Sequence, residues 1–436
     1  MSKSKVRISQ CMIVKNEEKN IERALSWGRP VMWEQIVVDT GSTDRTAEIA
    51  RQMGAKVYEF PWNDDFAAAK NYAIERCKGD WIAMLDADEY MQPEDRDKLP
   101  ELMAQADQRQ LDVLSADLQQ VREDGTSFSS STLVRFFRNV PELRYRRRIH
   151  EQLEAVTGRE LRWGDAVAEL AVFHTGYQKA VLKDKKKNER NKKLILAELK
   201  DHPDDHEMMG YMGDEYLSDE DRVKAAVWYG RAVEHMPERL GNYDSRSAAT
   251  LANYLMILTE SEDLGWRELY ETAVEKMPME ADFDYIAGRF FASQGQADQA
   301  VSHLEAALEK LETYGRNNRA MCLTRDLLGT YDLLVRCCYE AGQLEKSMSY
   351  GVTYLKYDRY NMAVLSRMLK VLLPDGGRRA GENQAVLEFF SKLYDFSGLK
   401  DRLFLVKTAR MSDCGGFGDY GADHLFTPEE RALLRV

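Results

Sequence analysis

The chain has 436 residues, of which 44% are hydrophobic and 31% are charged, and its formal net charge is -12 at pH 7. Its length exceeds that of a typical single domain, and its composition is that of a globular protein that can bury more than one core. The acidic balance argues against nucleic acid as the main partner, because neutralising phosphates requires a basic face.

The first apolar run, within "RISQCMIVK", is only a few residues long. It is too short for the core of a signal peptide or for a membrane span, so we expect no integral membrane segment. The six cysteines are scattered without the spacing of metal ligands, and several lie in apolar runs. We expect them to be buried free thiols in a reduced, cytoplasmic protein.

Residues 7 to about 90 alternate between short apolar runs and amphipathic segments. The expected strands are "RISQCMIVK", "EQIVVDT", "KVYEF" and "DWIAMLD", and the expected helices are "NEEKNIERALSW", "STDRTAEIARQMG" and "NDDFAAAKNYAIERCKG". This alternation is typical of a mostly parallel sheet with helices on its faces. Such sheets bind ligands beyond the carboxyl ends of their strands.

The pattern changes between about 110 and 178, where we expect strands with polar connections that complete the sheet or its substrate side. These strands are "DVLSADLQQV", "STLVRFFRN", "LRYRRRIHEQLE" and "LAVFHTGY". From about 180 the chain becomes helical. Its first helical segment, "KDKKKNERNKKLILAELKDHP", is basic and amphipathic, and we interpret it as a solvated linker helix.

An internal repeat with a 34-residue phase follows the linker. Its first unit has bulky, Gly, aromatic, Ala and Pro residues at the tetratricopeptide spacing: Met209, Met212, Gly213, Tyr216, Ala225, Tyr229, Ala232 and Pro237. Later units, near 270–278, 287–307 and 334–347, match less completely. Small residues at these places let paired helices pack closely. We therefore expect tetratricopeptide-like repeats rather than a stack of unrelated hairpins, then a glycine-rich loop and a capped helix from Thr427.

Polar side chains follow the first two expected strands. Asn16 and Glu17 follow the first, and Asp39 ends the second, where a base or sugar could be bound by hydrogen bonds. Gly41 allows a tight turn, and we expect Asp44 to stabilise this turn and the next helix rather than to contact a ligand.

Lys70 and Asn71 lie side by side in an expected helix that is otherwise apolar. A lysine is usually a solvated surface charge. In this apolar setting, Lys70 could instead reach a diphosphate, and both alternatives stay open.

The fourth expected strand ends in Asp86-Ala87-Asp88. Alternate residues of a strand point the same way, so the two carboxylates would converge on one side. Two hard oxygen ligands suit Mg²⁺ or Mn²⁺ that also holds phosphate oxygens. A lone Asp-x-Asp is common by chance, but its place at the end of the fourth strand of an alternating domain makes a metal site the specific prediction.

Several of these segments resemble successive motifs of the family 2 inverting glycosyltransferases of the GT-A fold. They are "CMIVKNEEKNIERAL", "EQIVVDTGSTDRTAEIA", "WNDDFAAAKNYAI" and "GDWIAMLDADE". The segments "RRRIHEQL" and "FHTGY" match the His-Glu and His-x-Gly-Tyr elements of one branch of that family. This branch often carries tetratricopeptide repeats, and the layout is similar to that of the sublancin-type peptide S-glycosyltransferases.

The resemblance implies an architecture and an activity. The expected architecture is an α/β GT-A domain, Rossmann-like with a mostly parallel sheet, over 1–178, a linker helix over 179–204, and an all-α repeat domain over 205–436. The expected activity is the inverting, metal-dependent transfer of a sugar from a nucleoside-diphosphate donor. The divalent cation would neutralise the leaving diphosphate as a Lewis acid.

The resemblance also implies which residues hold the nucleotide. Asn16, Glu17 and Asp39 would contact the nucleoside. Lys70 and Asn71 would lie near the base or the diphosphate. The family more often has Arg at the place of Lys70, and Lys supplies the charge without the planar fork of a guanidinium.

The remaining implied roles concern the sugar and the metal. Asp86 would hold the ribose or the metal, Asp88 would ligate the metal through the diphosphate, and Glu89 would lie beside the donor sugar. For the carboxylate base that helps the acceptor attack, we favour Glu151, which follows His150 at the end of an expected strand.

Two histidines compete for the place of third metal ligand. His150 is adjacent to Glu151 in the matching motif, whereas His174 in "AVFHTGY" could equally be a core or turn residue. The basic run of Arg144 and residues 146–148 is either a solvated strand edge or supplies one or two contacts to the diphosphate.

Four functions remain to be compared. The first is transfer of a sugar to a peptide or protein that the repeats present, and the second is transfer to a surface polysaccharide or glycan precursor, with the repeats forming a homodimer. The third is an inactive scaffold, against which the intact set of acids argues. The fourth, a nucleotidyltransferase, lacks the basic, glycine-rich loop it would need near "VKNEEKN". The sugar, the donor base and the acceptor atom stay open.

Overall fold

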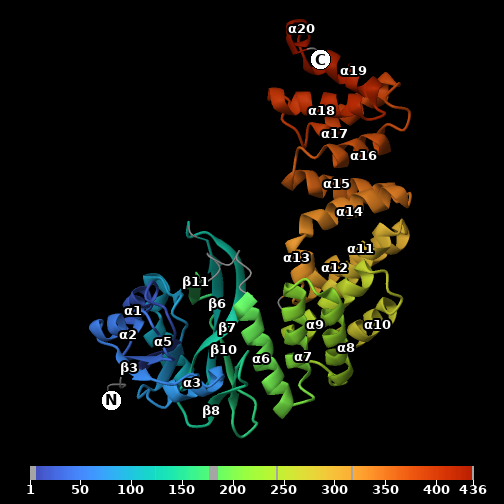
Figure 1. The fold of residues 1–436 in the computed structure, drawn as a ribbon. Coiled ribbons are helices and arrows are strands. Elements are labelled where there is room, and N and C mark those ends of the chain that lie inside the picture. The colour runs from blue at the N-terminus through green and yellow to red at the C-terminus, as the bar shows by residue number, and fades with distance from the viewer. Residues whose placement is uncertain (1–5, 123, 176–184, 242–243, 316–317, 435–436) are drawn as a thin grey trace. The chain divides into compact units, whose positions relative to one another are not determined.

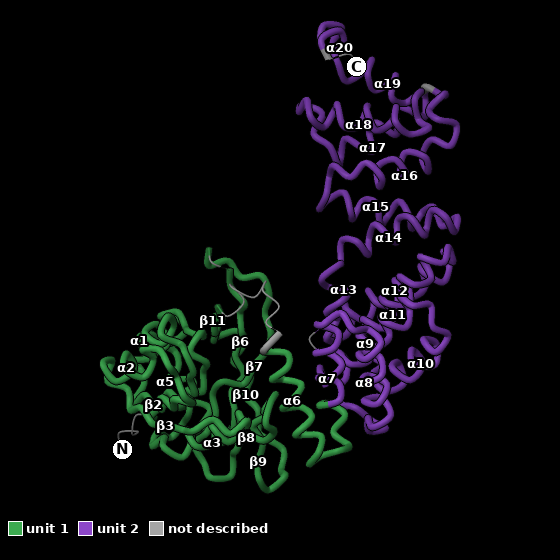
Figure 2. The backbone as a smooth tube through the Cα atoms, viewed as in Figure 1, with its two compact units in different colours: residues 1–208 green, residues 209–436 purple. Residues whose placement is uncertain are grey.

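The computed structural model describes residues 6–122, 124–175, 185–241, 244–315 and 318–434. The chain divides into two compact units, Met1–Met208 and Met209–Val436 (Figure 2). The predicted bounds of the N-terminal domain, the linker and the repeat domain remain a proposal. Residues 176–184, which include the end of "FHTGY" and the start of the predicted linker helix, lie outside the described residues.

Four parallel strands form one half of the sheet in the first unit (Figure 1). In spatial order they are β3 (Lys56–Glu59), β2 (Glu34–Asp39), β1 (Ile8–Val14) and β4 (Trp81–Met84). The helices that connect them are α1 (Ile21–Gly28), α2 (Thr46–Gln52) and α3 (Phe66–Ile74). The alternation of strands and helices predicted from residues 7 to 90 is confirmed.

Apolar side chains alternate along β1 between two cores. Met12 and Val14 pack with residues of α1 and α2, whereas Cys11 packs with residues of α3. Helices therefore cover both faces of this half of the sheet, and its strands are accordingly apolar on both sides. The polar residues that follow each strand are left to form the carboxyl edge.

The other half of the sheet is mixed. β7 (Ser127–Arg138) pairs antiparallel with β4, and β6 (Val113–Val121), β11 (Ala171–His174) and β5 (Glu89–Tyr90) follow in that order, with β10 (Trp163–Asp165) also on β6. Two short helices, α4 (Pro93–Arg96) and α5 (Leu99–Gln108), precede β6. The parallel half joined to a mixed half is the GT-A-like sheet that the resemblance implies.

One expected strand proves to be a hairpin. The segment "LRYRRRIHEQLE" forms β8 (Leu143–Arg146) and β9 (Gln152–Ala155), a separate antiparallel pair. Our prediction that Glu151 follows His150 at the end of a strand is therefore wrong, because both residues lie in the turn between β8 and β9. Arg147 and His150 have φ values of 74° and 52°, which a strand does not allow.

The rest of the described chain is helical. After α6 (Lys185–Asp201) come α7 (His206–Ser218), α8 (Arg222–His235), α9 (Ser245–Glu260), α10 (Trp266–Lys276), α11 (Asp282–Ser293), α12 (Ala297–Tyr314), α13 (Met321–Arg325), α14 (Leu327–Glu340), α15 (Leu344–Tyr357), α16 (Met362–Leu372), α17 (Ala380–Phe390), α18 (Leu399–Met411), α19 (Gly415–Leu425) and α20 (Pro428–Leu434). No helix in the described ranges is both long enough and apolar enough to cross a membrane.

The small residues of the repeat allow the close helix packing that we predicted. A Cβ added to Gly213 would come within 2.4 Å of the ring of Tyr229, which is fully buried against it. The "CGGFGDYG" stretch, expected as a loop, is instead the first part of α19. Gly416 serves packing there, since a Cβ on it would lie 2.7 Å from the carbonyl oxygen of Gly377. The cysteines are free, and all except the partly buried Cys322 are buried.

Candidate functional site

The carboxyl ends of β1, β2 and β4 bring the predicted acids together. The loops after β1 and β2 meet where the Glu17 amide donates a 2.7 Å hydrogen bond to Thr46 Oγ1. Burial of the Glu17 carboxyl raises its pKa, and a hydrogen bond from Asn20 opposes the rise. Neighbouring negative charges raise it further, and they belong to Asp88, Asp44 and Asp86. The strand ends therefore form one acidic cluster at the edge of the sheet.

The loops after β1 and β2 are tied to each other by polar side chains. Asn16, whose φ is 59°, accepts a hydrogen bond on Oδ1 from the Thr43 amide at 2.8 Å, and its own amide donates to Ser42 Oγ at 3.0 Å. Asp39 Oδ1 accepts from the Ser42 amide at 2.9 Å and from the Gly41 amide at 3.2 Å. These two residues build the loops, and their contacts with a nucleoside stay a prediction.

Asp44 stabilises the start of α2, as predicted. Its Oδ1 accepts hydrogen bonds from the Thr46 amide at 3.0 Å and the Thr46 hydroxyl at 2.5 Å, and its Oδ2 accepts from the Glu18 amide at 3.2 Å. Desolvation alone would raise the pKa of Asp44, but these hydrogen bonds lower it. The residue is therefore held ionised by the turn that it caps.

Arg135 on β7 joins two of the predicted acids. Its Nε lies 2.8 Å from Glu89 Oε2, and its Nη2 lies 2.5 Å from Glu89 Oε1 and 3.1 Å from Asp86 Oδ2. The Glu89 side chain is only 1% exposed, and its Oε2 also accepts a hydrogen bond from the Asp86 amide at 3.0 Å. Glu89 thus uses both oxygens on Arg135, and its place beside a donor sugar stays a prediction.

The charges of Arg135, Glu89 and Asp86 affect the pKa values of the two carboxyls. Burial raises the pKa of Glu89, and Arg135 opposes that rise. Burial would also raise the pKa of Asp86, but the positive charges of Arg135, Lys70 and His174 lower it. Asp86 therefore stays ionised, and its side chain remains 46% exposed to solvent.

Sequence reasoning missed Arg135. Its signal was present, because it interrupts the apolar run of Val134, Phe136 and Phe137 in an expected strand. A charged residue inside such a run needs a buried partner of opposite charge. The partner could not be chosen from the sequence, since the pairing of β4 with β7 joins segments about fifty residues apart.

His174, at the end of β11, faces Asp88. Its Nε2 lies 3.1 Å from Asp88 Oδ2, and its Nδ1 lies 2.6 Å from Gln120 Oε1 on β6. Since an amide oxygen only accepts, Nδ1 carries a hydrogen and Nε2 is directed at the carboxylate. Thr175 adds two hydrogen bonds of 3.1 Å to the Asp88 carbonyl, one from its amide and one from its hydroxyl.

The same geometry raises the pKa of His174. Burial lowers this pKa, but the hydrogen bond to Asp88 and the charges of Asp88, Glu89 and Asp86 outweigh it. An imidazole nitrogen and a carboxylate oxygen facing each other are a donor set that a divalent cation can share in place of the proton. In the described part of the chain, neither His150 nor His174 joins Asp86 and Asp88 in a set of three ligand atoms within 4.8 Å of one another, so the metal ligands stay a prediction.

Lys70 is buried and paired with Glu151. Its Nζ lies 2.5 Å from Glu151 Oε1, its side chain is only 7% exposed, and it lies 5.0 Å from the centre of the Tyr145 ring. Burial lowers the pKa of Lys70, but the charges of Asp86 and Glu151 raise it above its usual range. Lys70 is therefore charged, and it links Glu151 electrostatically to the acidic edge.

Asn71 attaches α3 to β8. Its Nδ2 donates to the Tyr145 carbonyl at 2.8 Å, and its Oδ1 accepts from the Tyr145 amide at 2.9 Å. The helix begins at Phe66, because Asp65 caps it through a 2.8 Å hydrogen bond from the Ala68 amide. Contact of Asn71 with a diphosphate stays a prediction.

The arginines of the basic run have partners within the protein. Arg144 donates to the carbonyls of Val140 and Leu143, and Arg146 pairs with Glu154 at 3.4 Å. Residues 147 and 148 pair with acids of α6 and of the segment that follows it. A contact of this run with a diphosphate therefore stays a prediction that would require these pairs to exchange partners.

Comparison with known proteins identifies the region that holds this cluster. Residues 9–160 match the family described as "Glycosyl transferase family 2". They form a family 2 glycosyltransferase domain. The match begins in β1 and ends just after β9, so Asp86, Asp88 and Glu151 lie inside it. His174 lies beyond its end.

Three curated relatives extend or support this match. A TPR repeat-containing protein of Synechococcus elongatus is 33% identical over 244 residues, which cover 55% of this chain and 59% of the relative. The SPbeta prophage-derived glycosyltransferase SunS of Bacillus subtilis is 28% identical over 238 residues, covering 53% of each chain. An uncharacterized glycosyltransferase of Rickettsia bellii is 41% identical over 102 residues, covering 23% of this chain and 34% of the relative.

The matches cover less than two thirds of each of these relatives. Among solved structures, residues 1–349 of TarS of S. aureus in complex with UDP-GlcNAc are 16% identical, with a TM-score of 0.36 over 62% of this chain and 93% of that one. This score is too low to carry an inference. The family 2 domain is therefore shown by sequence, and the activity of the whole protein is a matter for proposal.

Proposed function

We propose that the family 2 domain transfers a sugar from a UDP- or GDP-linked donor to a peptide or protein, with inversion at the anomeric carbon. The observation that carries this proposal is the carboxyl edge of the sheet, where Asp86 and Asp88 follow β4 and His174 is directed at Asp88. The inverting outcome rests on the resemblance to the inverting members of family 2. The nucleoside-diphosphate donor is inferred because an acidic edge can hold a divalent cation, and such a cation can bind a diphosphate.

The residues at the edge fit a divalent cation. Asp88 Oδ2 and His174 Nε2 would bind it, with Asp86 contributing to the metal or to the ribose, and His150 remains the alternative nitrogen ligand. An imidazole in the donor set favours Mn²⁺ over Mg²⁺, whose ligands are almost all oxygens. The cation would supply the positive charge that stabilises the departing diphosphate.

Glu151 is the base in this proposal. Lys70 holds its carboxylate in one place, because the buried Lys70 ammonium lies 2.5 Å from Glu151 Oε1 and the raised pKa of Lys70 keeps that ammonium charged. An ionised carboxylate can accept the proton of an acceptor hydroxyl, thiol or amide as it attacks. Asn16, Glu17 and Asp39 would contact the nucleoside, and Lys70 and Asn71 would lie near the base or the diphosphate.

The acceptor is inferred from the helical repeats. Stacks of tetratricopeptide-like hairpins form extended concave surfaces that suit extended peptides. Transfer to a surface polysaccharide or glycan precursor, with the repeats forming a homodimer, is the second candidate. A cytoplasmic location is part of the same proposal.

Slow hydrolysis of the donor tests the proposed function without knowledge of the acceptor. The full chain is incubated with a panel of UDP- and GDP-sugars and Mn²⁺, and release of the nucleoside diphosphate is measured. At least one donor should be hydrolysed, and Asp88→Asn should abolish this hydrolysis. The control is Asp124→Asn, which changes an exposed acid of the β6–β7 turn that accepts hydrogen bonds from Thr126. Failure to bind any donor in calorimetry would contradict the proposal and favour an inactive scaffold.

A further inference from the structure

The turn between β8 and β9, residues 147–151, carries the proposed base and is conformationally unusual. Arg147 and His150 both have positive φ values, 74° and 52°, although neither is glycine. Side chains other than glycine adopt this left-handed region at a cost, so it persists only where surrounding contacts hold it. The position of Glu151 therefore depends on what holds the turn.

Helix α6 provides one of these contacts through a buried carboxylate. The Glu198 side chain is only 6% exposed, and its Oε2 accepts hydrogen bonds from the Arg148 amide at 2.9 Å and from Arg148 Nη1 at 3.3 Å. Asp201, one turn later, receives Arg148 Nη2 at 2.7 Å. A glutamate is rarely so buried unless it is paired, and here its partner is a residue of the turn.

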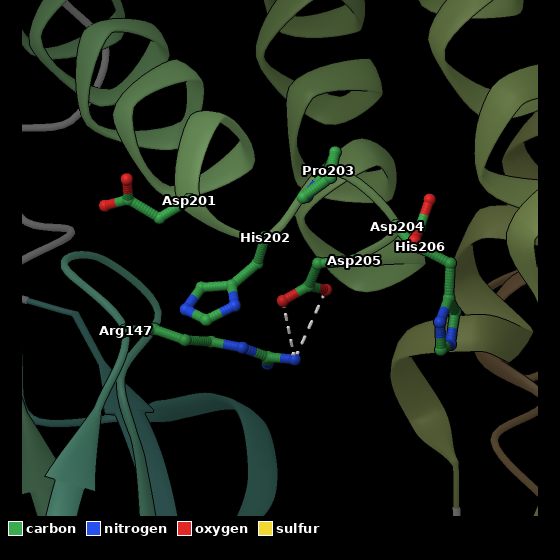
Figure 3. Close-up of a pocket in the computed structure, with 7 residues that line it drawn as sticks. All are labelled: Arg147, Asp201, His202, Pro203, Asp204, Asp205 and His206. Carbon is green, nitrogen blue, oxygen red and sulfur yellow. Dashed lines mark hydrogen bonds and ion pairs between the residues drawn. The ribbon is translucent and has the colours of Figure 1, made fainter.

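The neighbouring arginine is held in a similar way. Arg147 Nη2 lies 3.0 Å and 3.3 Å from the two carboxylate oxygens of Asp205, and Arg147 also pairs with Glu207. Figure 3 shows the Arg147 side chain extended along the segment after α6, with its guanidinium directed at Asp205. This segment and Arg147 line a pocket of about 470 Å³, and no residue predicted to bind the metal or the nucleoside lines it. The pocket marks an ion-paired junction rather than a donor site.

The peptide groups of Arg148 connect α6 to the site. Its amide is bound by Glu198, and its carbonyl accepts a 2.9 Å hydrogen bond from the Phe66 amide at the start of α3. About one turn further along α3, Lys70 pairs with Glu151. Arg148 therefore lies between α6 on one side and, on the other, the helix that carries the partner of Glu151.

We propose that Glu198 is a positioning residue that holds the 147–151 turn and thereby sets the geometry of the Lys70–Glu151 pair. This inference rests on the proposed role of Glu151 as base. Glu198 lies outside the family 2 match and fixes the Arg148 amide, so α6 would help to position the proposed base. Displacement of a reacting group by about 1 Å can lower a rate on the order of 100-fold.

Three variants of the full chain test the proposal. Glu198→Ala removes the acceptor of the Arg148 amide, and Glu198→Gln keeps an acceptor oxygen but removes the charge. The matched control is Glu189→Gln on the same helix, because Glu189 is 73% exposed and pairs with Lys192 of that helix. Thermal melting verifies that each variant is folded.

The first measurement is hydrogen exchange of the peptide that spans residues 144–152. Exchange at the Arg148 amide should accelerate on the order of tenfold in Glu198→Ala, less in Glu198→Gln, and not in the control. The second is the hydrolysis of the donor selected in the panel of UDP- and GDP-sugars. For Glu198→Ala, kcat should fall by about 10- to 100-fold while KM changes by less than about twofold.

A double variant separates positioning from general damage. If Glu198 acts through Glu151, Glu198→Ala should cause no further loss of kcat in a Glu151→Gln background. Independent, multiplicative losses would overturn the proposal, as would faster exchange at Arg148 with unchanged kcat. If the wild-type protein hydrolyses no donor, the proposed function fails and this inference with it. Wild-type hydrolysis with a fully active Glu198→Ala would refute this inference alone.

Discussion

Replacing Arg135 with methionine would remove the charge that the buried Glu89 shares with the partly exposed Asp86. Arg135 contacts both oxygens of Glu89 and one oxygen of Asp86, and Glu89 has almost no access to water. The methionine fills similar space without a charge, so the perturbation is chiefly electrostatic. Arg135→Met therefore leaves Glu89 buried and unpaired at neutral pH.

The expected loss is large for a single substitution. Breaking a buried ion pair by removing one partner typically costs about 3–5 kcal/mol, because the remaining charge is left desolvated. For a unit of some two hundred residues, this corresponds to a fall in melting temperature of about 6–20 °C. The matched control is Arg45→Met, since Arg45 pairs with Glu48 on the surface and should change the melting temperature little.

The loss should depend on pH with a definite sign. The folded-state pKa of Glu89 is already raised by burial, and without Arg135 it rises further. A raised pKa means that the protonated carboxyl favours the folded state, so the penalty appears as pH rises through the folded-state pKa and fades at lower pH. In urea unfolding, the free energy of unfolding of the first unit should therefore differ more between wild type and Arg135→Met at pH 8 than at pH 5.

A second substitution identifies the cause. Adding Glu89→Gln to Arg135→Met removes the unpaired charge, so the double variant should be more stable than Arg135→Met and should lose most of its extra pH dependence. A double variant as unstable as the single one, or an Arg135→Met penalty that does not change between pH 5 and pH 8, would refute the electrostatic reasoning.

Two further predictions concern the metal and the repeats. Gln120→Leu removes the acceptor that orients the His174 ring, and it should weaken Mn²⁺ binding in the presence of UDP by about 10- to 100-fold. The control, Gln119→Leu on the same strand, should leave Mn²⁺ binding unchanged. Equal Mn²⁺ affinities of the two variants in titrations followed by electron paramagnetic resonance would contradict this prediction. Gly213→Ala places a methyl group against the Tyr229 ring and should destabilise the second unit by about 1–3 kcal/mol in urea unfolding. Gly381→Ala, where a Cβ meets nothing within 4 Å, is its control, and equal midpoints for both would count against the packing argument.

The parts of the site that follow local patterns could be predicted from the sequence. Short apolar strands alternating with amphipathic helices determine where strands end, and polar residues at those ends share one edge of a parallel sheet. Glu17, Asp86 and Asp88 could be grouped on this basis alone. The repeat could be recognised because each unit needs small residues at fixed places.

The parts that depend on distant pairing could not be predicted. Arg135 reaches its acids only because β7 pairs with β4, and His174 reaches Asp88 because β11 lies between β6 and β5. Lys70 reads from sequence as a solvated charge or a diphosphate contact, but its helix is packed on β8 so that it meets Glu151. From the sequence, the segment 147–151 is expected to continue a strand, because a run of charged residues fits an exposed strand edge as well as a turn. The acids of α6 that pair with this turn are distant in the sequence, so they could not be assigned to it.

Calorimetry of UDP and GDP with the full chain, with and without Mn²⁺, tests the central claim most directly. The account predicts that one of these nucleotides binds tightly only when Mn²⁺ is present, and that Asp88→Asn removes this dependence and most of the affinity. Equal binding with and without Mn²⁺, or unchanged Mn²⁺-dependent binding to Asp88→Asn, would contradict the assignment of Asp88 and the edge of the sheet as the metal and diphosphate site.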